Sequence, residues 1–506
     1  MRYYKIVTNY ILLIILVFGS SEVYAQTEPQ KNIETPTLNN NEFERFSSAV
    51  QSYFLQQKKF KAEIKKGRES PSQTEDKNVL VNDITRIGIN QQEPSIGVMR
   101  LENDEKVILS NFNTSEGIYS KSTLGSFTGM AYSFDGGITF QDQGKLPGAE
   151  NTPQMFFGDP GVKSDGKRFR VSSLLWPRLD AQSGFYAISL STGEVNTELK
   201  KIVFGQPKVT VFSRDFLDKP YLTIDTKTEQ TTIYVSYTRF PELMSNGQIE
   251  LVKSEDGGET WSKPVIVHSE EEDKINQGSY PAVAPNGTLH VTWQRDWHGP
   301  NPEIWISKSS DHGKTFEPTK FVAKINKISN RPPVGYSRGS INEFPSITIT
   351  PQGTILISFI GGNVSGDPDI YVARSTDTGK TWNIAEKPIN DDASGKYQFF
   401  PWISADQENN VVVAVWYDRR SATTTLPAIT DVYAAFSFDD GVTFGQNKRI
   451  TDVSSDWLKT KSEERFLNFG DYINAEVLDG IAFIVWADGR LGTPDIFLDR
   501  KDPNEQ

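Results

Sequence analysis

Arginines recur where short apolar strands end, in a chain that is acidic as a whole. The five segments read Trp176-Pro-Arg178, Tyr237-Thr-Arg239, Trp293-Gln-Arg295-Asp296, Trp416-Tyr-Asp418-Arg419-Arg420 and Trp486-Ala-Asp488-Gly-Arg490. A guanidinium makes two-point contacts that match a carboxylate or a sulfate, so this pattern predicts a site for an anionic group. A second interpretation stays open, in which the arginines pair with Asp296, Asp418 and Asp488 and brace the fold. The predicted substrate-binding residues are Arg178, Arg239, Arg295, Arg419, Arg490, Asp418 and Asp488.

An internal repeat shows which elements position these residues. Five segments follow the pattern Ser-x-Asp-x-Gly-x-Thr-aromatic, at residues 133–140, 254–261, 309–316, 375–382 and 437–444. The first gap is about twice as long as the others, and a degraded copy at Ser189, Ser191 and Gly193 is expected to fill it. Self-similarity at this spacing is typical of repeat folds built from one supersecondary unit.

A second repeated feature precedes each of these segments. Residues such as Glu93-Pro94, Asp159-Pro160, Lys219-Pro220, Phe400-Pro401 and Asp471-Tyr472 open a strand, which turns and continues into a second apolar strand. Seven such openings over residues 78–506 fit four-stranded units, so we predict an all-β, seven-bladed β-propeller with antiparallel blades. The last unit ends without an outer strand, and residues 79–84 are predicted to supply it and close the ring.

Composition excludes several classes of function. The chain has 506 residues, with 53 Lys+Arg against 65 Asp+Glu and a net charge of −12. An acidic protein of this kind is not expected to bind nucleic acid. Cys is 0, which excludes disulfides, thiolate metal sites and a cysteine nucleophile. The four histidines lack metal-site spacing, so neither a metal nor a cofactor is expected.

The N-terminal segment predicts export. Arg2 and Lys5 precede a short apolar run, and Val23-Tyr24-Ala25 fits a cleavage site, so residues 1–25 read as a cleavable signal peptide. Residues 26–77 are polar and contain one helical pattern, which predicts a short helix outside the propeller that docks on it. No later stretch is apolar enough to span a membrane. We therefore expect a secreted or periplasmic protein.

The repeated segments carry a family resemblance. Residues 93–506 resemble the Asp-box (BNR-repeat) propellers of the sialidase superfamily, in which the box is a folding motif. The resemblance implies a glycoside hydrolase with a tyrosine nucleophile, a glutamate that activates it and an aspartate as acid/base. Tyr472 occupies the place of that tyrosine, Glu343 or Glu93 could be the base, and Asp159 is the candidate acid/base. This chain departs from the family in having seven units where the family's propellers have six.

The leading hypothesis is an exported, sialidase-like glycoside hydrolase that acts on an anionic glycan or glycoconjugate. Two alternatives stay open. One is a polysaccharide lyase that removes a proton beside a uronate, and the other is a non-catalytic propeller that binds a glycan or a protein.

Overall fold

The computed structural model describes residues 78–86, 90–119, 126–148, 154–177, 185–227, 231–241, 246–268, 274–361, 368–393, 395–462 and 468–504. The predicted signal peptide and docking helix lie outside these residues. Across the described ranges, no helix has the length and apolar character needed to cross a membrane.

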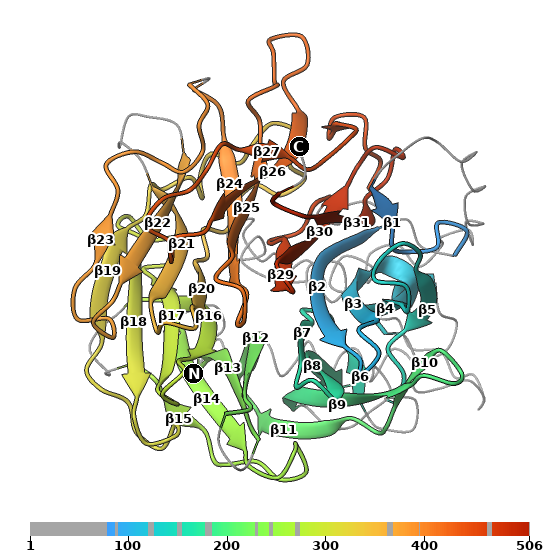
Figure 1. The fold of residues 1–506 in the computed structure, drawn as a ribbon, viewed down its shortest axis with the longest axis vertical. Helices are drawn as coiled ribbons and strands as arrows, with labels where there is room; N and C mark the ends of the chain where they lie inside the picture. Colours follow the sequence, from blue (N-terminus) through green and yellow to red (C-terminus); the bar gives the residue numbers. More distant parts are fainter. Residues whose placement is uncertain are drawn as a thin grey trace, which may run out of the picture.

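Seven antiparallel sheets follow one another around a ring in chain order, which confirms the predicted seven-bladed β-propeller (Figure 1). The innermost strand of each blade lies nearest the central axis and contacts the innermost strands of its neighbours. Blade one comprises β2 (Gln91–Arg100), β3 (Lys106–Thr114), β4 (Thr128–Ser133) and β5 (Gln141–Lys145), with the 3-10 helix η1 (Ser115–Tyr119) after β3. Blade two comprises β6 (Gln154–Phe156), β7 (Gly161–Ser164), β8 (Arg168–Pro177), β9 (Tyr186–Asn196), β10 (Lys201–Phe204) and β11 (Lys208–Ser213).

The next four blades repeat this plan. Blade three comprises β12 (Phe216–Asp225), β13 (Thr232–Phe240), β14 (Gln248–Ser254) and β15 (Val265–Ile266), and blade four β16 (Asn276–Val283), β17 (Leu289–Arg295), β18 (Glu303–Ser309) and β19 (Lys320–Lys324). Blade five comprises β20 (Ser346–Ile349), β21 (Ile355–Gly361), β22 (Asp369–Ser375) and β23 (Asn383–Ile384). Blade six comprises β24 (Gln398–Ala405), β25 (Val412–Asp418), β26 (Ile429–Ser437), β27 (Lys448–Arg449) and β28 (Ser455–Asp456).

Blade seven is completed by the N-terminal strand, as the sequence predicts. It comprises β29 (Asn474–Leu478), β30 (Ile481–Asp488), β31 (Asp495–Lys501) and β1 (Val79–Leu80). In Figure 1 the blue β1 lies beside the red β31, and the register pairs Val79 with Leu498 and Leu80 with Phe497. The closure covers the edge that β31 would otherwise expose, and exposed edges invite aggregation.

The five Ser-x-Asp-x-Gly-x-Thr segments form turns with one hydrogen-bond pattern. In blade one, Asp135 Oδ1 accepts the amides of Ile138 at 3.0 Å and Thr139 at 2.9 Å, and Ser133 Oγ accepts the amide of Gly137 at 2.8 Å. Asp256, Asp311, Asp377 and Asp439 make the same contact to the threonine amide. Each aspartate therefore satisfies backbone donors inside its own tight turn, which is a folding role.

The predicted degraded copy in blade two is not a turn. Ser189, Ser191 and Gly193 lie inside β9, which continues to Asn196 before the chain turns into β10. Without the aspartate there is no acceptor to hold a turn at Ser191, and the strand runs on. The prediction of a turn there was wrong, although the number of blades is as expected.

The two faces of the ring carry different parts of each blade. The start of each inner strand pairs with the end of the second strand, for example Gln91 with Thr114 and Gln398 with Asp418. We call the side where the inner strands begin the entry face. The Ser-x-Asp turns join third and fourth strands on the opposite side, the turn face. The predicted site residues therefore belong to the entry face.

Candidate functional site

The inner strands begin with an unusual backbone conformation. Glu93, Asp159 and Lys219 each have φ of 51°, and Phe400 has φ of 52°. The pairing register shifts at three of these steps, between Gln92 and Ser95, Asp218 and Tyr221, and Phe399 and Trp402. A left-handed conformation at a non-glycine residue costs about 1–3 kcal/mol and persists where the surroundings over-determine it, which is common at functional sites.

Three of these strained steps bring charged side chains together at the axis. Lys219 Nζ lies 3.2 Å from Asp471 Oδ2, 3.4 Å from Asp159 Oδ2 and 3.6 Å from Glu93 Oε2. Burial lowers the pKa of Lys219, but the carboxylates of Asp159, Glu93 and Asp471 outweigh it and raise that pKa well above the ordinary value. Lys219 therefore stays charged and holds three carboxylates around one ammonium group.

A loop between blades four and five adds a second cation. Residues 325–345 cross the entry face to blade seven, where Arg338 Nη1 donates to Asp471 Oδ1 at 2.8 Å. The hydroxyl of Tyr336 donates to the carbonyl of Gly470 at 3.0 Å. Burial acts against the charged form of Asp471, yet Arg338 and Lys219 hold its pKa below the ordinary value. Asp471 is thus a fixed carboxylate clamped between two cations.

Asp218, next to Lys219 in the chain, has its pKa shifted in the opposite direction from that of Asp471. Burial and the neighbouring charge of Asp159 raise the pKa of Asp218 well above the ordinary value, and its carboxyl group accepts a hydrogen bond from Gln277 Nε2 at 2.7 Å. A carboxyl group whose surroundings favour the neutral form therefore lies beside Asp159, which is ion-paired with Lys219. Glu93, Asp159, Asp218, Lys219, Arg338 and Asp471 form what we call the axial cluster, and none of the six is more than 4% exposed.

Asn113 ties the first two blades together at this cluster. Its Nδ2 donates to Glu93 Oε2 at 2.8 Å, and its Oδ1 accepts the amide of Asp159 at 2.8 Å. Because one side chain fixes both acids, the separation between Glu93 and Asp159 is set by the packing of blade one against blade two.

Tyr472 lies next to the axial cluster. Lys219 Nζ is 5.2 Å from the centroid of the Tyr472 ring, and the ring packs edge-on against Tyr221 at 5.7 Å. Within the described part of the chain, the buried hydroxyl of Tyr472 has no hydrogen-bond partner. Burial, with Tyr221 and the nearby acids, raises the pKa of Tyr472 well above its ordinary value. The hydroxyl therefore keeps its proton unless a neighbouring carboxylate accepts it. The structure thus brings together three of the four predicted catalytic residues: Tyr472, Asp159 and Glu93.

Glu343 makes its contacts elsewhere, between blades four and five. It accepts hydrogen bonds from the amides of Ile328 and Ser329, the latter at 2.7 Å, and from Gln294 Nε2 at 2.9 Å. Burial raises its pKa to about 7, although these three donors act in the other direction. These hydrogen bonds brace the crossing loop against β17, and the predicted role of Glu343 as a catalytic base stays a prediction.

Replacing Glu343 with glutamine is expected to flatten the pH dependence of stability. Between pH 4.5 and 7 the carboxyl group of Glu343 keeps its proton in the native protein, whereas in the unfolded chain it has released it. This group therefore lowers the free energy of unfolding by about 3 kcal/mol as pH rises through that window. Glutamine can accept the same amide hydrogen bonds without titrating. Urea unfolding at pH 5 and pH 7.5 should show the difference, and Glu259→Gln, at an exposed position, should match the wild type. Equal pH slopes in Glu343→Gln and wild type would refute the shift.

Two predicted arginines and two predicted aspartates are engaged in ion pairs and hydrogen bonds with neighbouring side chains. Arg239 contacts Asp215 at 2.6 Å and Glu250 at 2.7 Å. Arg490 Nη2 and Trp486 Nε1 both donate to Asp488 Oδ2 at 2.8 Å. Asp418 repeats this pattern in blade six with Trp416 and Arg420, each at 2.8 Å. These contacts agree with the second interpretation of the sequence, in which the arginines pair with acids and brace the fold.

The other predicted arginines differ from one another. Arg178 lies outside the described residues. Arg295 stacks on the ring of Trp305, with its guanidinium carbon 4.4 Å from the ring centroid. In blade six it is Arg420, rather than the predicted Arg419, that corresponds to Arg490.

Arg419 has unusual surroundings for an arginine. Its side chain is 3% exposed, and Nη1 donates to the carbonyl of Pro427 at 3.2 Å. Its Nε and Nη2 have no hydrogen-bond partner in the portion of the chain that the structure describes. Burial lowers its pKa to about 9. Burying a guanidinium group with unpaired donors costs free energy. Arg419 is therefore a predicted arginine that still has donors available to bind an anion.

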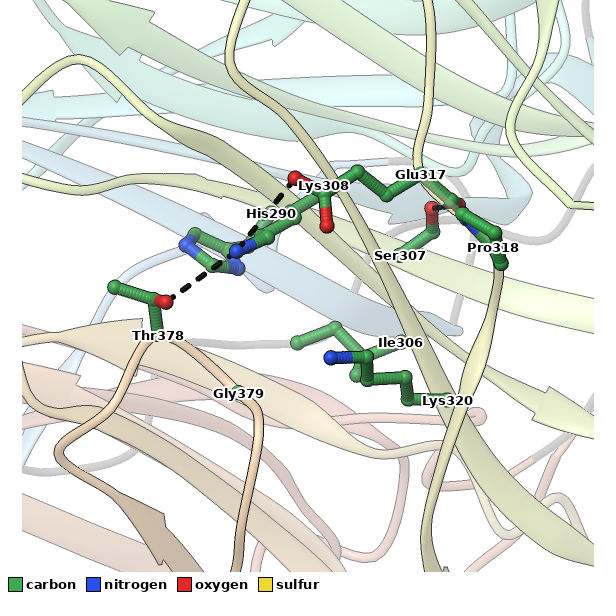
Figure 2. A pocket seen from close by; sticks show the side chains of 9 residues that line it. All are labelled: His290, Ile306, Ser307, Lys308, Glu317, Pro318, Lys320, Thr378 and Gly379. Atoms are coloured by element: carbon green, nitrogen blue, oxygen red, sulfur yellow. Dashed lines mark hydrogen bonds and ion pairs between the residues drawn. The ribbon is translucent and has the colours of Figure 1, made fainter.

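A small cavity beside His290 lies apart from the axial cluster. Figure 2 shows it at the boundary of blades four and five, with Lys308 reaching Thr378 Oγ1 at 3.3 Å and Glu317 at 3.6 Å. Its volume of about 10 Å³ suits a single water rather than a ligand. Burial lowers the pKa of His290 to about 4, so the ring is neutral. This agrees with a structural role for that histidine.

Four members of the axial cluster were missed by the sequence reasoning. Lys219 stands at the same step as Glu93 and Asp159, with the same φ of 51°, and Asp218 and Asp471 stand in or directly before predicted openings, which was a usable signal. Arg338 gave no signal, because it belongs to a long connection outside the repeat.

Fold and site together define a closed seven-bladed propeller with a buried acid–base cluster at the entry end of its axis. No protein-family model matches this chain, and no curated protein matches it. Solved structures similar to it include an α-L-arabinofuranosidase of Fusarium graminearum with an iminosugar inhibitor, at 12% identity over 67% of this chain and 92% of that chain, with a TM-score of 0.41. An α-L-arabinanase of Penicillium chrysogenum complexed with arabinobiose has 10% identity over 85% and 99%, with a TM-score of 0.44. The sialidase of Trypanosoma rangeli has 14% identity over 86% and 58%, with a TM-score of 0.40. All three named proteins are glycoside hydrolases.

Proposed function

We propose that this protein is a glycoside hydrolase whose active site is the axial cluster with Tyr472. The observation that carries the proposal is the pair formed by Asp218, whose surroundings favour the neutral acid, and Asp159, whose carboxylate lies 3.4 Å from Lys219 Nζ. Glycoside hydrolysis needs a carboxylic acid that protonates the leaving oxygen and a second group that stabilises or attacks the anomeric carbon. Two acids whose surroundings favour opposite protonation states are the usual means of filling these roles at neutral pH.

We assign each side chain a role from its position in the cluster. The proton shared by Asp218 and Asp159 goes to the glycosidic oxygen as the bond to the anomeric carbon breaks. Tyr472 attacks that carbon while Glu93 accepts the phenolic proton, which avoids forming a buried phenolate. Water then attacks the glycosyl–tyrosine bond, gives its proton to the acid pair, and Tyr472 recovers its own from Glu93. Lys219 and Arg338 are positioning residues that hold the carboxylates in place.

The proposal also includes the superfamily, the export, the anionic substrate group and the alternative base that the sequence predicts. We place the chain in the sialidase superfamily on its Ser-x-Asp turns, and we propose export through residues 1–25. An anionic substrate group now depends chiefly on Arg419, because Arg239 and Arg490 are paired with their own acids. Glu343 remains a proposed alternative base, supported by its raised pKa.

Tyr472→Phe tests the proposed nucleophile. On any glycan that the wild-type protein cleaves, the variant is expected to lose turnover by at least 100-fold while its melting temperature stays within a few degrees. Tyr234→Phe is the matched control, since Tyr234 is a fully buried tyrosine of β13 that is not part of the axial cluster. Unchanged turnover in Tyr472→Phe would remove that residue from the mechanism.

A further inference from the structure

The central channel opens on the turn face as a funnel that the proposed reaction does not use. Its volume is about 430 Å³, within the range of small-molecule sites. The ends of all seven inner strands line it, those of β2, β7, β12, β16, β20, β24 and β29. The funnel is therefore a feature of the closed ring as a whole.

Aromatic rings separate this funnel from the axial cluster. Tyr280 and Trp402 line the funnel and pack edge to face, with centroids 4.9 Å apart. The ring of Tyr221 packs against those of Tyr280 and Trp402, with centroid distances of 5.0 Å and 6.1 Å. It also packs against the ring of Tyr472, at 5.7 Å. These four rings form a plug across the channel, so a ligand in the funnel would not touch the axial acids.

Polar groups of both signs line the funnel beside the aromatic rings. Lys163 Nζ lies 3.6 Å from Glu476 Oε1, and Glu476 Oε2 accepts the amide of Val98 at 3.0 Å. Their side chains are 27% and 19% exposed, so both groups can also contact a ligand. Arg100 and Glu408, which also line the funnel, form an ion pair at 3.1 Å. Because these two pairs already join opposite charges, an ionic ligand that used any of the four groups would have to displace an internal ion pair.

Asp225 supplies an acceptor with spare capacity. It lines the funnel and is 1% exposed, and its Oδ1 accepts the amide of Lys227 at 2.9 Å. Its Oδ2 has no hydrogen-bond partner in the described ranges. An unpaired buried carboxylate oxygen costs free energy that a hydroxyl donor would recover.

We propose that the funnel is a second binding site, which takes a small neutral ligand rich in hydroxyl groups, such as a monosaccharide or the end of a neutral glycan chain. Aromatic edges offer apolar contact to a sugar ring, while Lys163, Glu476 and Asp225 offer both donors and acceptors to its hydroxyls. The site is distinct from the proposed active site and does not depend on it.

Calorimetry with neutral sugars tests the proposal. The probes are galactose, arabinose and cellobiose, with glucuronate as the anionic comparison, titrated into the full chain carrying Tyr472→Phe so that no probe is hydrolysed. Saturable binding of at least one neutral probe at one site is expected, with glucuronate weaker. Thr223→Phe places a ring in the funnel and is expected to weaken binding at least tenfold. Glu476→Gln keeps the hydrogen bond from Val98 but removes the ion pair, and is expected to weaken binding as well.

The control places the same ring outside the funnel. Val203, on β10, is 55% exposed, and Val203→Phe should bind as the parent does. The proposal is overturned if no neutral probe binds, if glucuronate binds more tightly, or if binding survives both Thr223→Phe and Glu476→Gln. Hydrolysis by the wild type is measured separately, so failure here leaves the proposed function untouched.

Discussion

Replacing Lys219 with methionine is expected to lower the free energy of unfolding by about 3–5 kcal/mol, because removal of one partner leaves buried charges uncompensated. Three carboxylates surround its ammonium group within 3.6 Å, and the side chain is 2% exposed. Methionine fills similar volume, so the loss reports charge rather than a cavity. Urea unfolding of the wild type and the variant at pH 7 measures it.

Lys208→Met is the matched control. Lys208 pairs with Glu259 at 2.7 Å, but both side chains are close to half exposed or more, and such surface pairs contribute about 0–1 kcal/mol. A second substitution, Asp159→Asn in the Lys219→Met background, should restore part of the lost stability by removing a carboxylate that has lost its cation. If Lys219→Met and Lys208→Met cost the same, the axial ammonium does not have the role that we assign to it.

Asp218→Asn is expected to reduce glycan hydrolysis by about 10²–10⁴-fold, the range of a lost general acid. Burial and the neighbouring Asp159 raise the pKa of Asp218 and favour its neutral form, which asparagine mimics while it can still accept from Gln277. Stability should therefore change little while activity falls. In the wild type, kcat/KM should decline as pH rises through the pKa of Asp218, and that limb should be missing in the variant.

Asp499→Asn separates a catalytic loss from the general effect of removing a buried acid. Asp499 lies on β31 in the outer part of blade seven, and burial raises its pKa to about 6. It makes no contact with the axial cluster in the described structure, so this variant should keep wild-type turnover. Equal losses in the two variants, or an intact alkaline limb in Asp218→Asn, would rule out Asp218 as the acid.

The fold was predictable because its signals are local and repeat. Each Ser-x-Asp turn uses its own aspartate to bind its own amides, so the motif indicates the same turn wherever it occurs. The closing strand was predictable from a missing element, since blade seven ends at β31 and needs β1. Ser191 shows the limit of the method: two matching residues suggested a turn, but the hydrogen-bonding aspartate was absent and β9 continues.

The site was only partly predictable, because it is built from contacts between blades. Glu93 and Asp159 stand at equivalent steps and Tyr472 stands in the corresponding opening of blade seven, so their convergence follows from the symmetry of the ring. The repeat could not show that Lys219 would lie among the acids while Phe400, at the same step, would not. Arg338 arrives through a loop with no repeat at all, and the partners of Arg239 depend on which way its side chain turns.

The most direct test of the central claim follows two signals from one incubation. The purified mature protein is mixed with sialylated, sulfated, uronate-containing and neutral arabinose-containing glycans, and both new reducing ends and ultraviolet absorbance are recorded. We expect reducing ends from at least one glycan without new absorbance, and their loss in Asp218→Asn. Rising absorbance would identify a lyase, and the absence of both signals across the panel would contradict hydrolysis at the axial cluster.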